Sequence, residues 1–152
     1  MKTDITQEYL RAIFYLDEDG DLFWRDTGEC AESFRHKYKA VWLDGIRHYS
    51  HRLIWMYLYG YWPHQVEHKN GDGSYNKPSN LRESTQSQNN ANANHGKFRG
   101  VEAHGTKYRA RIWVEGKRIE LGSFQTMKEA IDAYNEGALE YFGEFAFCAR
   151  SK

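Results

Sequence analysis

The chain has 152 residues, with 40% apolar and 16% aromatic side chains, which suffices for one medium domain or two small ones. No apolar run approaches the ~20 residues that span a bilayer, and Met1 to Ile5 lacks the basic-then-apolar layout of a signal peptide. We therefore expect no membrane insertion and no secretion, and a cytoplasmic location. The formal net charge is zero, which taken alone argues against a nucleic-acid-binding protein.

The charges are unevenly distributed, however. Residues 1–34 carry a net charge of −6, whereas residues 35–59 and 97–121 each carry +4. Salt screens the interaction of charges that are more than ~10 Å apart, so a bound phosphate is affected mainly by nearby charges. A basic region can therefore neutralise the phosphates of a ligand even when the whole protein has no net charge. Two ordinary solvated faces are the alternative interpretation. Cys30 and Cys148 form no C-x-x-C pattern, so we expect free thiols rather than a disulfide or a zinc site.

The first elements follow from periodicity and turn chemistry. Apolar residues at helical spacing predict a helix over residues 4–16, followed by a turn at 17–20 and a strand over 22–25. Alternating residues 37–49 predict a hairpin about Asp44-Gly45. This hairpin is either a half-buried sheet with one solvated side or a surface that meets DNA.

Two further elements follow the hairpin. Ser50 is predicted to cap a helix that runs to Tyr59 and ends at Gly60. After it, Val66 to His68 is predicted to be a strand, and residues 70–73 a turn. A second strand and a helix over residues 84–94 follow, the helix opened by the capping-box pattern Thr85-x-x-Gln88.

This strand, loop, strand and helix resemble the HNH, or His-Me finger, nucleases of phage homing-endonuclease type. The resemblance is carried by Glu67-His68, Asn80-Leu81-Arg82 and Asn89, and by the upstream runs Asp19-Gly20-Asp21-Leu22-Phe23-Trp24, Ser50-His51-Arg52-Leu53-Ile54-Trp55 and Gly60-Tyr61-Trp62-Pro63. It implies an α+β fold with a ββα-metal core at about residues 64–94. Glu67 stands where this branch of the family more often has aspartate, which keeps the charge and lengthens the side chain.

The resemblance also implies a role for each polar residue. His68, whose imidazole has an ordinary pKa near ~6.5, is the candidate general base. Asn80 is placed to accept a hydrogen bond from the second ring nitrogen of His68 and so to fix its tautomer. Glu67 and Asn89 are expected to hold one divalent metal ion, Mg²⁺ or Mn²⁺, as oxygen ligands.

Each of these residues also has an ordinary interpretation. A histidine beside a glutamate is commonly an incidental surface pair, and Asn80 or Asn89 alone would be a turn residue or a helix amide. Their joint spacing favours the nuclease site. The remaining histidines are interpreted as ordinary residues, although His51, beside Arg52, could lie near the site; the others are His36, His48, His64, His95 and His104.

The last third of the chain reads as a separate module. Residues 88–96 lose apolar periodicity and are predicted to be a polar linker. Short strands are predicted at residues 98–101, 107–114 and 117–124, and a helix from the capping residue Thr126 to Gly143. A small α+β module with a basic rim would need no further explanation.

Residues 97–147 resemble the DNA-binding domain of plant ethylene-response (APETALA-type) transcription factors. The matching landmarks are Arg99-Gly100-Val101, Tyr108-Arg109-Ala110-Arg111-Ile112, Leu121-Gly122-Ser123-Phe124, Glu129-Ala130, Ala133-Tyr134 and Phe142-Gly143. A three-stranded sheet of this kind can lie in the major groove of DNA. The side chains we expect to contact DNA are Arg99, Arg109, Arg111, Lys117 and Arg118. Glu102-Ala103-His104 departs from the family pattern, so base specificity does not carry over.

The sequence thus predicts a nuclease domain over residues 1–95 and a sheet-plus-helix DNA-binding domain over residues 96–152. The predicted function is a site-specific, nicking homing endonuclease that acts on double-stranded DNA as a monomer or weak dimer in a phage-infected bacterial host. The alternatives are a DNA-binding regulatory protein with a silent HNH unit and, disfavoured by the basic sheet, a structural metal-binding protein. Metal-dependent relaxation of supercoiled DNA separates the first two.

Overall fold

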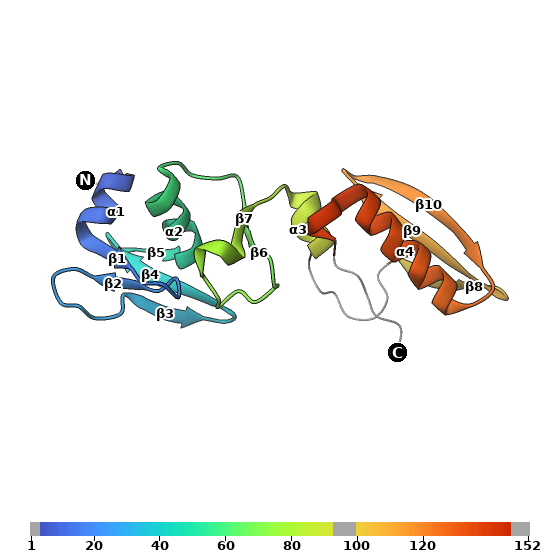
Figure 1. Cartoon of the computed structure of the whole chain (residues 1–152), viewed down its shortest axis with the longest axis horizontal. Coiled ribbons are helices and arrows are strands. Elements are labelled where there is room, and N and C mark those ends of the chain that lie inside the picture. Colours follow the sequence, from blue (N-terminus) through green and yellow to red (C-terminus); the bar gives the residue numbers. More distant parts are fainter. Residues whose placement is uncertain (1–3, 93–99, 147–152) are drawn as a thin grey trace. The chain divides into compact units, whose positions relative to one another are not determined.

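The structure is a computed structural model that describes residues 4–92 and 100–146. It divides into two compact units, Met1–Ser84 and Thr85–Lys152, and each combines helices with small antiparallel sheets (Figure 1), as expected for an α+β protein. The division lies before helix α3 (Gln86–Asn92), whereas the sequence analysis placed it at residue 95. Ala91 of α3 packs against the core of the second unit. This contact explains why α3 belongs to the second unit and why the division lies before residue 95. Among the described helices, none is long and apolar enough to cross a membrane.

The first unit begins with helix α1 (Gln7–Ile13) and the hairpin of β1 (Phe14–Leu16) and β2 (Leu22–Trp24). The predicted helix over residues 4–16 is therefore wrong at its C-terminal end. Its last three residues instead form an antiparallel pair with β2, with Phe14 opposite Trp24. Phe14 is fully buried there, so packing against a strand further along the chain overrides the helical periodicity.

The second sheet contains β3 (Glu32–Arg35), β4 (Tyr38–Leu43) and β5 (Ile46–Tyr49), in that order. The predicted hairpin of β4 and β5 is confirmed. Its turn residues Asp44 and Gly45 have φ values of 51° and 75°, as a type I′ hairpin turn requires. Strand β3 was not predicted. It adds an edge to the hairpin and completes a three-stranded sheet.

Helix α2 (Ser50–Tyr59) forms the centre of the first core. It ends as predicted, with Gly60 in the left-handed conformation at φ 78°. Its start differs, because Tyr49 is the N-cap residue and Ser50 the first helical residue, and no side-chain bond caps the helix. The core residues around it are fully or almost fully buried; they include Leu10, Phe14, Leu22, Val41, Leu43, Leu53 and Ile54.

Two short strands close the first unit. Strands β6 (Val66–His68) and β7 (Leu81–Glu83) pair in antiparallel fashion, and the short helix η1 (Pro78–Asn80) leads into β7. The predicted order of strand, loop, strand and helix is confirmed, because α3 follows. The predicted capping box opens α3: Thr85 N–H donates to Gln88 Oε1 at 2.9 Å, and Gln88 N–H donates to Thr85 Oγ1 at 3.2 Å.

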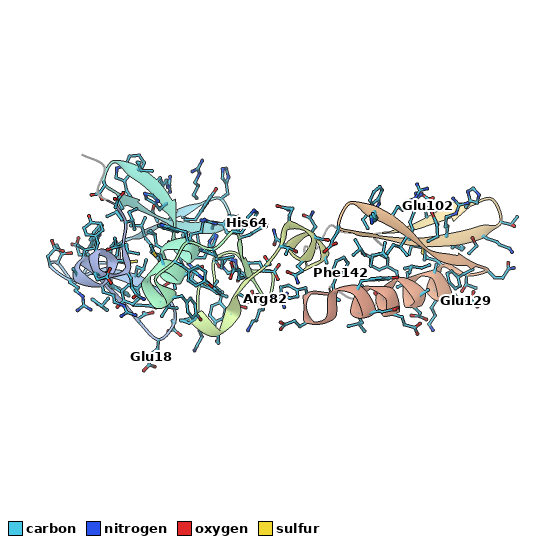
Figure 2. All side chains as sticks on the ribbon, turned by 90° about the horizontal axis from the view of Figure 1, so that it is seen from above. Glu18, His64, Arg82, Glu102, Glu129 and Phe142 are labelled. Atoms are coloured by element: carbon cyan, nitrogen blue, oxygen red, sulfur yellow. The ribbon has the colours of Figure 1, made fainter. Side chains whose placement is uncertain are left out.

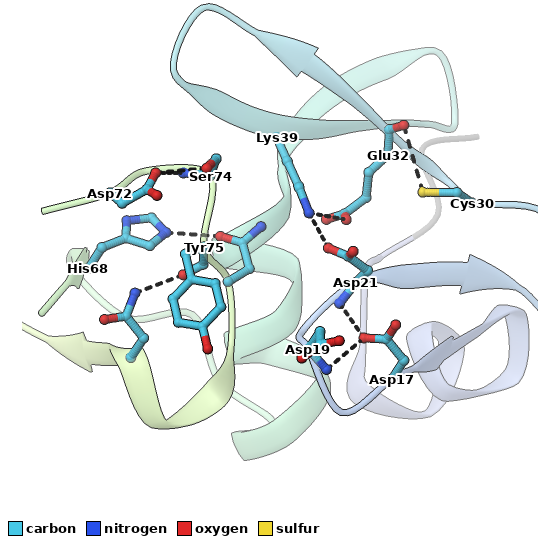
Figure 3. Close-up of polar contacts among 12 residues, drawn as sticks. Asp17, Asp19, Asp21, Cys30, Glu32, Lys39, His68, Asp72, Ser74 and Tyr75 are labelled. Atoms are coloured by element: carbon cyan, nitrogen blue, oxygen red, sulfur yellow. Dashed lines mark hydrogen bonds and ion pairs between the residues drawn. The ribbon is translucent and has the colours of Figure 1, made fainter. Parts of the chain in front are cut away.

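A partly buried ionic cluster joins β3 and β4 to Asp21, the residue before β2 (Figure 3). The Lys39 ammonium pairs with Asp21 and lies 3.8 Å from Glu32 Oε2. The Glu32 side chain is only 2% exposed, and its burial raises the pKa of Glu32 to about 7. Lys39 therefore lies on the inner face of the second sheet, together with Val41 and Leu43.

The second unit is built on β8 (Val101–His104), β9 (Lys107–Val114) and β10 (Lys117–Phe124), with β9 central. The second and third predicted strands are confirmed. The first begins at Val101, the last residue of the predicted range, and runs on to His104; residues 98 and 99, half of the predicted strand, lie outside the described residues.

Helix α4 (Met127–Phe142) covers one face of this sheet, and the short helix η2 (Gly143–Phe145) follows it. Thr126 and Glu129 form a capping box at its start, which confirms the predicted helix and its cap. Its buried side chains pack on Ile112 of β9, and Phe142 is among them (Figure 2).

The turn of the first hairpin approaches the loop after β6 closely at Gly20, and substitutions at this glycine test how much that contact contributes to stability. It adopts φ +87°, and a Cβ at this position would lie 2.3 Å from the backbone oxygen of Asn76. Gly28 has a similar φ of +73° but nothing within 4 Å of its Cβ position. We expect Gly28→Ala to lower the free energy of unfolding by about 1–2 kcal/mol, through backbone strain alone. Gly20→Ala should lower it by about 2–5 kcal/mol, because steric overlap is added to the strain.

Urea unfolding of both variants measures the two effects. Equal losses for Gly20→Ala and Gly28→Ala would mean that the close approach to Asn76 contributes nothing to stability.

Candidate active site around His68

His68 occupies the last position of β6 and is only 6% exposed. Its Nε2 lies 2.9 Å from the side-chain oxygen of Asn76. A carbonyl oxygen can only accept, so Nε2 carries the hydrogen and Nδ1 carries the lone pair. Burial lowers the pKa of His68, outweighing the hydrogen bond to Asn76, which acts in the opposite direction. His68 is therefore a neutral imidazole of defined tautomer at neutral pH.

The loop that supplies Asn76 is held by Asn80. The side-chain amide of Asn80 donates to Asn70 Oδ1 at 3.0 Å and to the Tyr75 carbonyl at 2.8 Å. Its oxygen accepts from the Asn70 N–H at 3.1 Å. Three bonds from one buried side chain thus fix both ends of the loop, and Figure 3 draws the bond that the Tyr75 carbonyl accepts.

Asn80 therefore differs from the role implied by the resemblance. It was expected to accept a hydrogen bond from His68, but the structure gives that contact to Asn76. Asn80 acts one step further away, through the loop backbone. The sequence patterns did not identify Asn76; the available signal was its position in the loop that follows β6, eight residues after His68.

A carboxylate lies at the outer end of this loop. Asp72 Oδ1 accepts hydrogen bonds from the Ser74 N–H at 2.9 Å and the Ser74 hydroxyl at 2.7 Å (Figure 3). These bonds lower the pKa of Asp72, with the hydroxyl bond the larger cause. Asp72 is thus a negative charge whose field favours the protonated form of His68.

Two aromatic rings lie next to His68, and a third stacks on one of them. The His51 ring lies 5.1 Å from that of His68 in an edge-on arrangement, and Tyr38 lies 6.1 Å from His68. Tyr49 stacks on His51 at 5.6 Å. His51 belongs to the first turn of α2 and is 8% exposed. The sequence suggested that His51 could lie near the site, and in the structure its ring contacts that of His68.

The neighbour of His68 on the strand has a different environment. Glu67 is 3% exposed, and its Oε1 accepts from Nε of Arg82, the residue directly opposite on β7. A carboxylate buried this deeply needs a cation to offset its lost hydration. Arg82 supplies that charge within the described residues, and any metal ion that binds Glu67 must share the carboxylate with it.

Asn89, the second predicted metal ligand, is partly buried on α3 in the second unit, and its N–H donates to the Thr85 carbonyl at 2.9 Å. Over residues 4–92 and 100–146, no group of three or more His, Cys, Asp or Glu side chains could hold a metal ion. Glu67 belongs to the first unit and Asn89 to the second, so their pairing as metal ligands stays a prediction. Carboxylate and amide oxygens are of the kind that Mg²⁺ prefers.

The predicted DNA-binding residues occupy several positions in the second unit. Arg109 and Arg111 share the face of β9 that is turned away from α4, because Ala110 and Ile112 between and after them are buried. Arg118 pairs opposite Trp113 on the same face, and Lys117 falls on the alternate register. Arg99 lies outside the described residues.

Carboxylates partly neutralise this face. Arg111 pairs with Glu102, and Arg118 Nε lies 3.3 Å from Glu120 Oε1.

The cysteines were expected to be free thiols. Cys30 is an exposed free thiol, and Cys148 falls outside the described ranges.

A buried histidine held by an asparagine, on a strand, loop, strand and helix unit, has the composition of a hydrolytic site. A family model described as HNH endonuclease matches residues 48–91 of the chain. This segment contains α2, the two short strands and most of α3, and the match supports a nuclease. Searches of curated proteins and of solved structures both find no match.

The burial of His51 predicts how stability depends on pH. Burial, with smaller effects of His68 and Arg52, lowers the pKa of His51 from 6.5 to about 3. Between these values the unfolded chain binds a proton that the folded chain does not, so stability falls as the pH falls. One such group contributes about 1.4 kcal/mol per pH unit. We expect His51→Phe to flatten the decline by about this amount between pH 6 and 4.

Urea unfolding as a function of pH measures the slope. His64→Phe, at an exposed histidine outside the aromatic cluster, is the control and should retain the wild-type slope. A His51→Phe slope as steep as that of the wild-type protein would contradict the assignment.

Proposed function

We propose that this protein is a site-specific DNA endonuclease that hydrolyses a phosphodiester bond, with His68 as general base and one divalent metal ion. The observation that carries the proposal is the buried His68 imidazole held at Nε2 by Asn76, inside the segment that matches the HNH endonuclease family. Hydrolysis near neutral pH needs a base that is unprotonated before the reaction, and burial favours the unprotonated form of His68 by lowering its pKa.

The chain's own residues account for the handling of the proton. Because Nε2 is occupied as a donor to Asn76, the lone pair on Nδ1 is the one that can accept a proton from a water molecule. Asn76 then faces the imidazolium, and the Asp72 charge favours the protonated ring. Asn80 keeps Asn76 in place through its bonds to the loop.

Glu67 and Asn89 are the residues that would hold Mg²⁺ or Mn²⁺, in keeping with the general use of divalent metal ions by HNH nucleases. A carboxylate and an amide oxygen match the preference of a hard cation. When bound, the ion would polarise the phosphate and neutralise the charge of the leaving oxygen. Arg82 limits the free charge on Glu67, so we expect a site that is completed by the substrate rather than a tight protein-only site.

The proposal assigns DNA positioning to the second unit, through Arg99, Arg109, Arg111, Lys117 and Arg118. One such catalytic site cuts one strand, so a monomer leaves a nick, whereas a double-strand break needs a dimer or a second encounter. A mobile-element or homing role in a phage-infected bacterium is the biological setting that the resemblance suggests.

One observation favours a second candidate, a DNA-binding regulatory protein with a silent HNH unit. Glu67 is already neutralised by Arg82 inside the protein, which would suit a residue retained for structure alone. The two candidates differ in a single experiment. Relaxation of supercoiled DNA that depends on added Mg²⁺ or Mn²⁺ supports the nuclease, and DNA binding without relaxation supports the regulator.

His68→Ala is expected to reduce the nicking rate by about 10²–10⁴-fold while leaving DNA affinity nearly unchanged, because a general base acts in the transition state. Single-turnover nicking and a binding titration measure the two quantities. His64→Ala is the matched control at an exposed histidine. Near-wild-type nicking by His68→Ala in metal-containing buffer would exclude His68 as the base.

Asn76 variants test whether this residue positions the His68 imidazole, with the same nicking and binding measurements. Asn76→Asp retains an acceptor for Nε2 but adds a negative charge, so it should raise the pKa of His68 and move the acidic limb of the pH–rate profile upward. Asn76→Ala should lower kcat with little effect on DNA affinity.

Glu67→Gln and Asn89→Ala should each raise the metal concentration that gives half-maximal nicking. Gln is chosen at position 67 because its amide oxygen can still accept a hydrogen bond from Arg82, whereas Ala would remove the acceptor at this position as well as the charge. Asn90→Ala, one residue further along α3, is the control and should leave the metal dependence unchanged. Titrations of Mg²⁺ and Mn²⁺ make the comparison, and an unchanged curve for both test variants would place the metal elsewhere. Glu67→Asp is the informative addition, because it restores the residue more common in this branch.

A further inference from the structure

The outer face of the sheet formed by β3, β4 and β5 carries a row of basic and aromatic side chains. In an antiparallel sheet, directly paired residues point to the same side. The pairs Arg35 with Tyr38, Ala40 with Tyr49 and Trp42 with Arg47 therefore share one face. Lys37 in the adjoining turn extends the row. We call this surface the sheet strip; it consists of Arg35, Lys37, Tyr38, Trp42, Arg47 and Tyr49.

The opposite face of the same sheet belongs to the core. Val41 and Leu43 pack there against α2, and Lys39 pairs with Asp21. The sheet strip is thus the side exposed to solvent, and Trp42 is 65% exposed on it. An indole this exposed costs hydration free energy in the isolated protein and is typical of surfaces that bind a partner.

The cations of the sheet strip are not paired with acids. Arg35 lies over the Tyr49 ring at 5.8 Å and Lys37 over the Tyr38 ring at 5.1 Å. Arg47 donates to Ser33 Oγ and to the Phe34 carbonyl, both at 3.1 Å. Within the described ranges, none of the three forms an ion pair with a carboxylate. On the sheet of the second unit, by contrast, Arg111 and Arg118 are both paired with glutamates.

The sheet strip is continuous with the candidate active site. The ring of Tyr38 lies 5.5 Å from that of Tyr49 and 6.1 Å from that of His68. From Tyr38 to Trp42 the strand covers about 13 Å, which corresponds to about four base pairs of duplex DNA. A DNA duplex bound along this surface would therefore reach from the proposed general base, His68, over a few nucleotides.

We propose that the sheet strip binds the sugar-phosphate backbone of double-stranded DNA next to the phosphate that is cleaved. Arg35, Lys37 and Arg47 contact phosphates, and Trp42 packs on sugars or base edges. Unneutralised cations at fixed spacing match the charge of a polyphosphate, and exposed aromatic rings match its apolar sugars and bases. This inference rests on the proposed nuclease function, because it takes DNA as the substrate.

The test compares the salt dependence of duplex binding for the wild-type full chain and for variants of it, without divalent metal. The triple variant Arg35→Gln, Lys37→Gln, Arg47→Gln should reduce the slope of log affinity against log salt by about 2.7, because each lost phosphate contact reduces it by about 0.9. Trp42→Ala should weaken binding about tenfold and leave the slope unchanged.

Two controls accompany these variants. The first control is the double variant Arg11→Gln, Arg25→Gln. Arg11 lies on α1 and Arg25 follows β2, and both are exposed and donate to backbone carbonyls, as Arg47 does. The slope should stay at its wild-type value. Arg109→Gln, Arg111→Gln, Arg118→Gln measures the contribution of the second unit in the same assay. If Arg47→Gln perturbs folding, the double variant Arg35→Gln, Lys37→Gln should still reduce the slope by about 1.8.

The outcomes separate this inference from the proposed function. A wild-type slope in the triple and double variants overturns the sheet strip, whatever the nuclease assay shows. A reduced slope together with no metal-dependent nicking by the wild-type protein retains the sheet strip as a DNA-binding surface and overturns the nuclease. No binding of duplex DNA by the wild-type protein overturns both.

Discussion

The hydrogen bond between His68 and Asn76 is the contact on which the rest of the candidate site depends. Both side chains are buried, and a buried polar group that loses its partner costs about 1–3 kcal/mol. The structure therefore has to keep the loop after β6 in one conformation, and it does so from two directions. Asn80 joins the loop to itself through Asn70 and Tyr75, and the turn at Gly20 packs on the Asn76 backbone. The orientation of one imidazole is thus the product of residues from three separate segments.

The two units handle positive charge in different ways. In the second unit, arginines on the outer face of the sheet are partly neutralised by Glu102 and Glu120. In the first unit, the basic side chains of the sheet strip contact aromatic rings and backbone oxygens instead. Charges without acidic partners retain their full attraction for phosphate, whereas paired charges must first give up a partner. A protein with zero net charge can in this way still present a locally basic surface.

Glu67 illustrates the balance between structure and chemistry at the candidate site. Its carboxylate is almost completely buried and is paired with Arg82. The pair offsets the cost of burying either charge alone and fixes the register of β6 against β7. The same pairing lowers the charge available to a cation, so a metal ion at this carboxylate would need additional oxygen ligands.

The sequence by itself determined the elements whose signals are local. The Asp44-Gly45 turn, the end of α2 at Gly60 and the capping boxes at Thr85 and Thr126 each depend on a few neighbouring residues. The strand that carries Glu67 and His68 was predicted for the same reason. The tertiary structure decided what depends on residues far apart in the chain. Residues 14–16 left the predicted helix to pair with β2, Asn76 rather than Asn80 came to hold His68, and His51 came to lie against His68. Helical periodicity and turn chemistry act over a few positions, whereas burial and the pairing of polar groups are decided only when distant segments pack together.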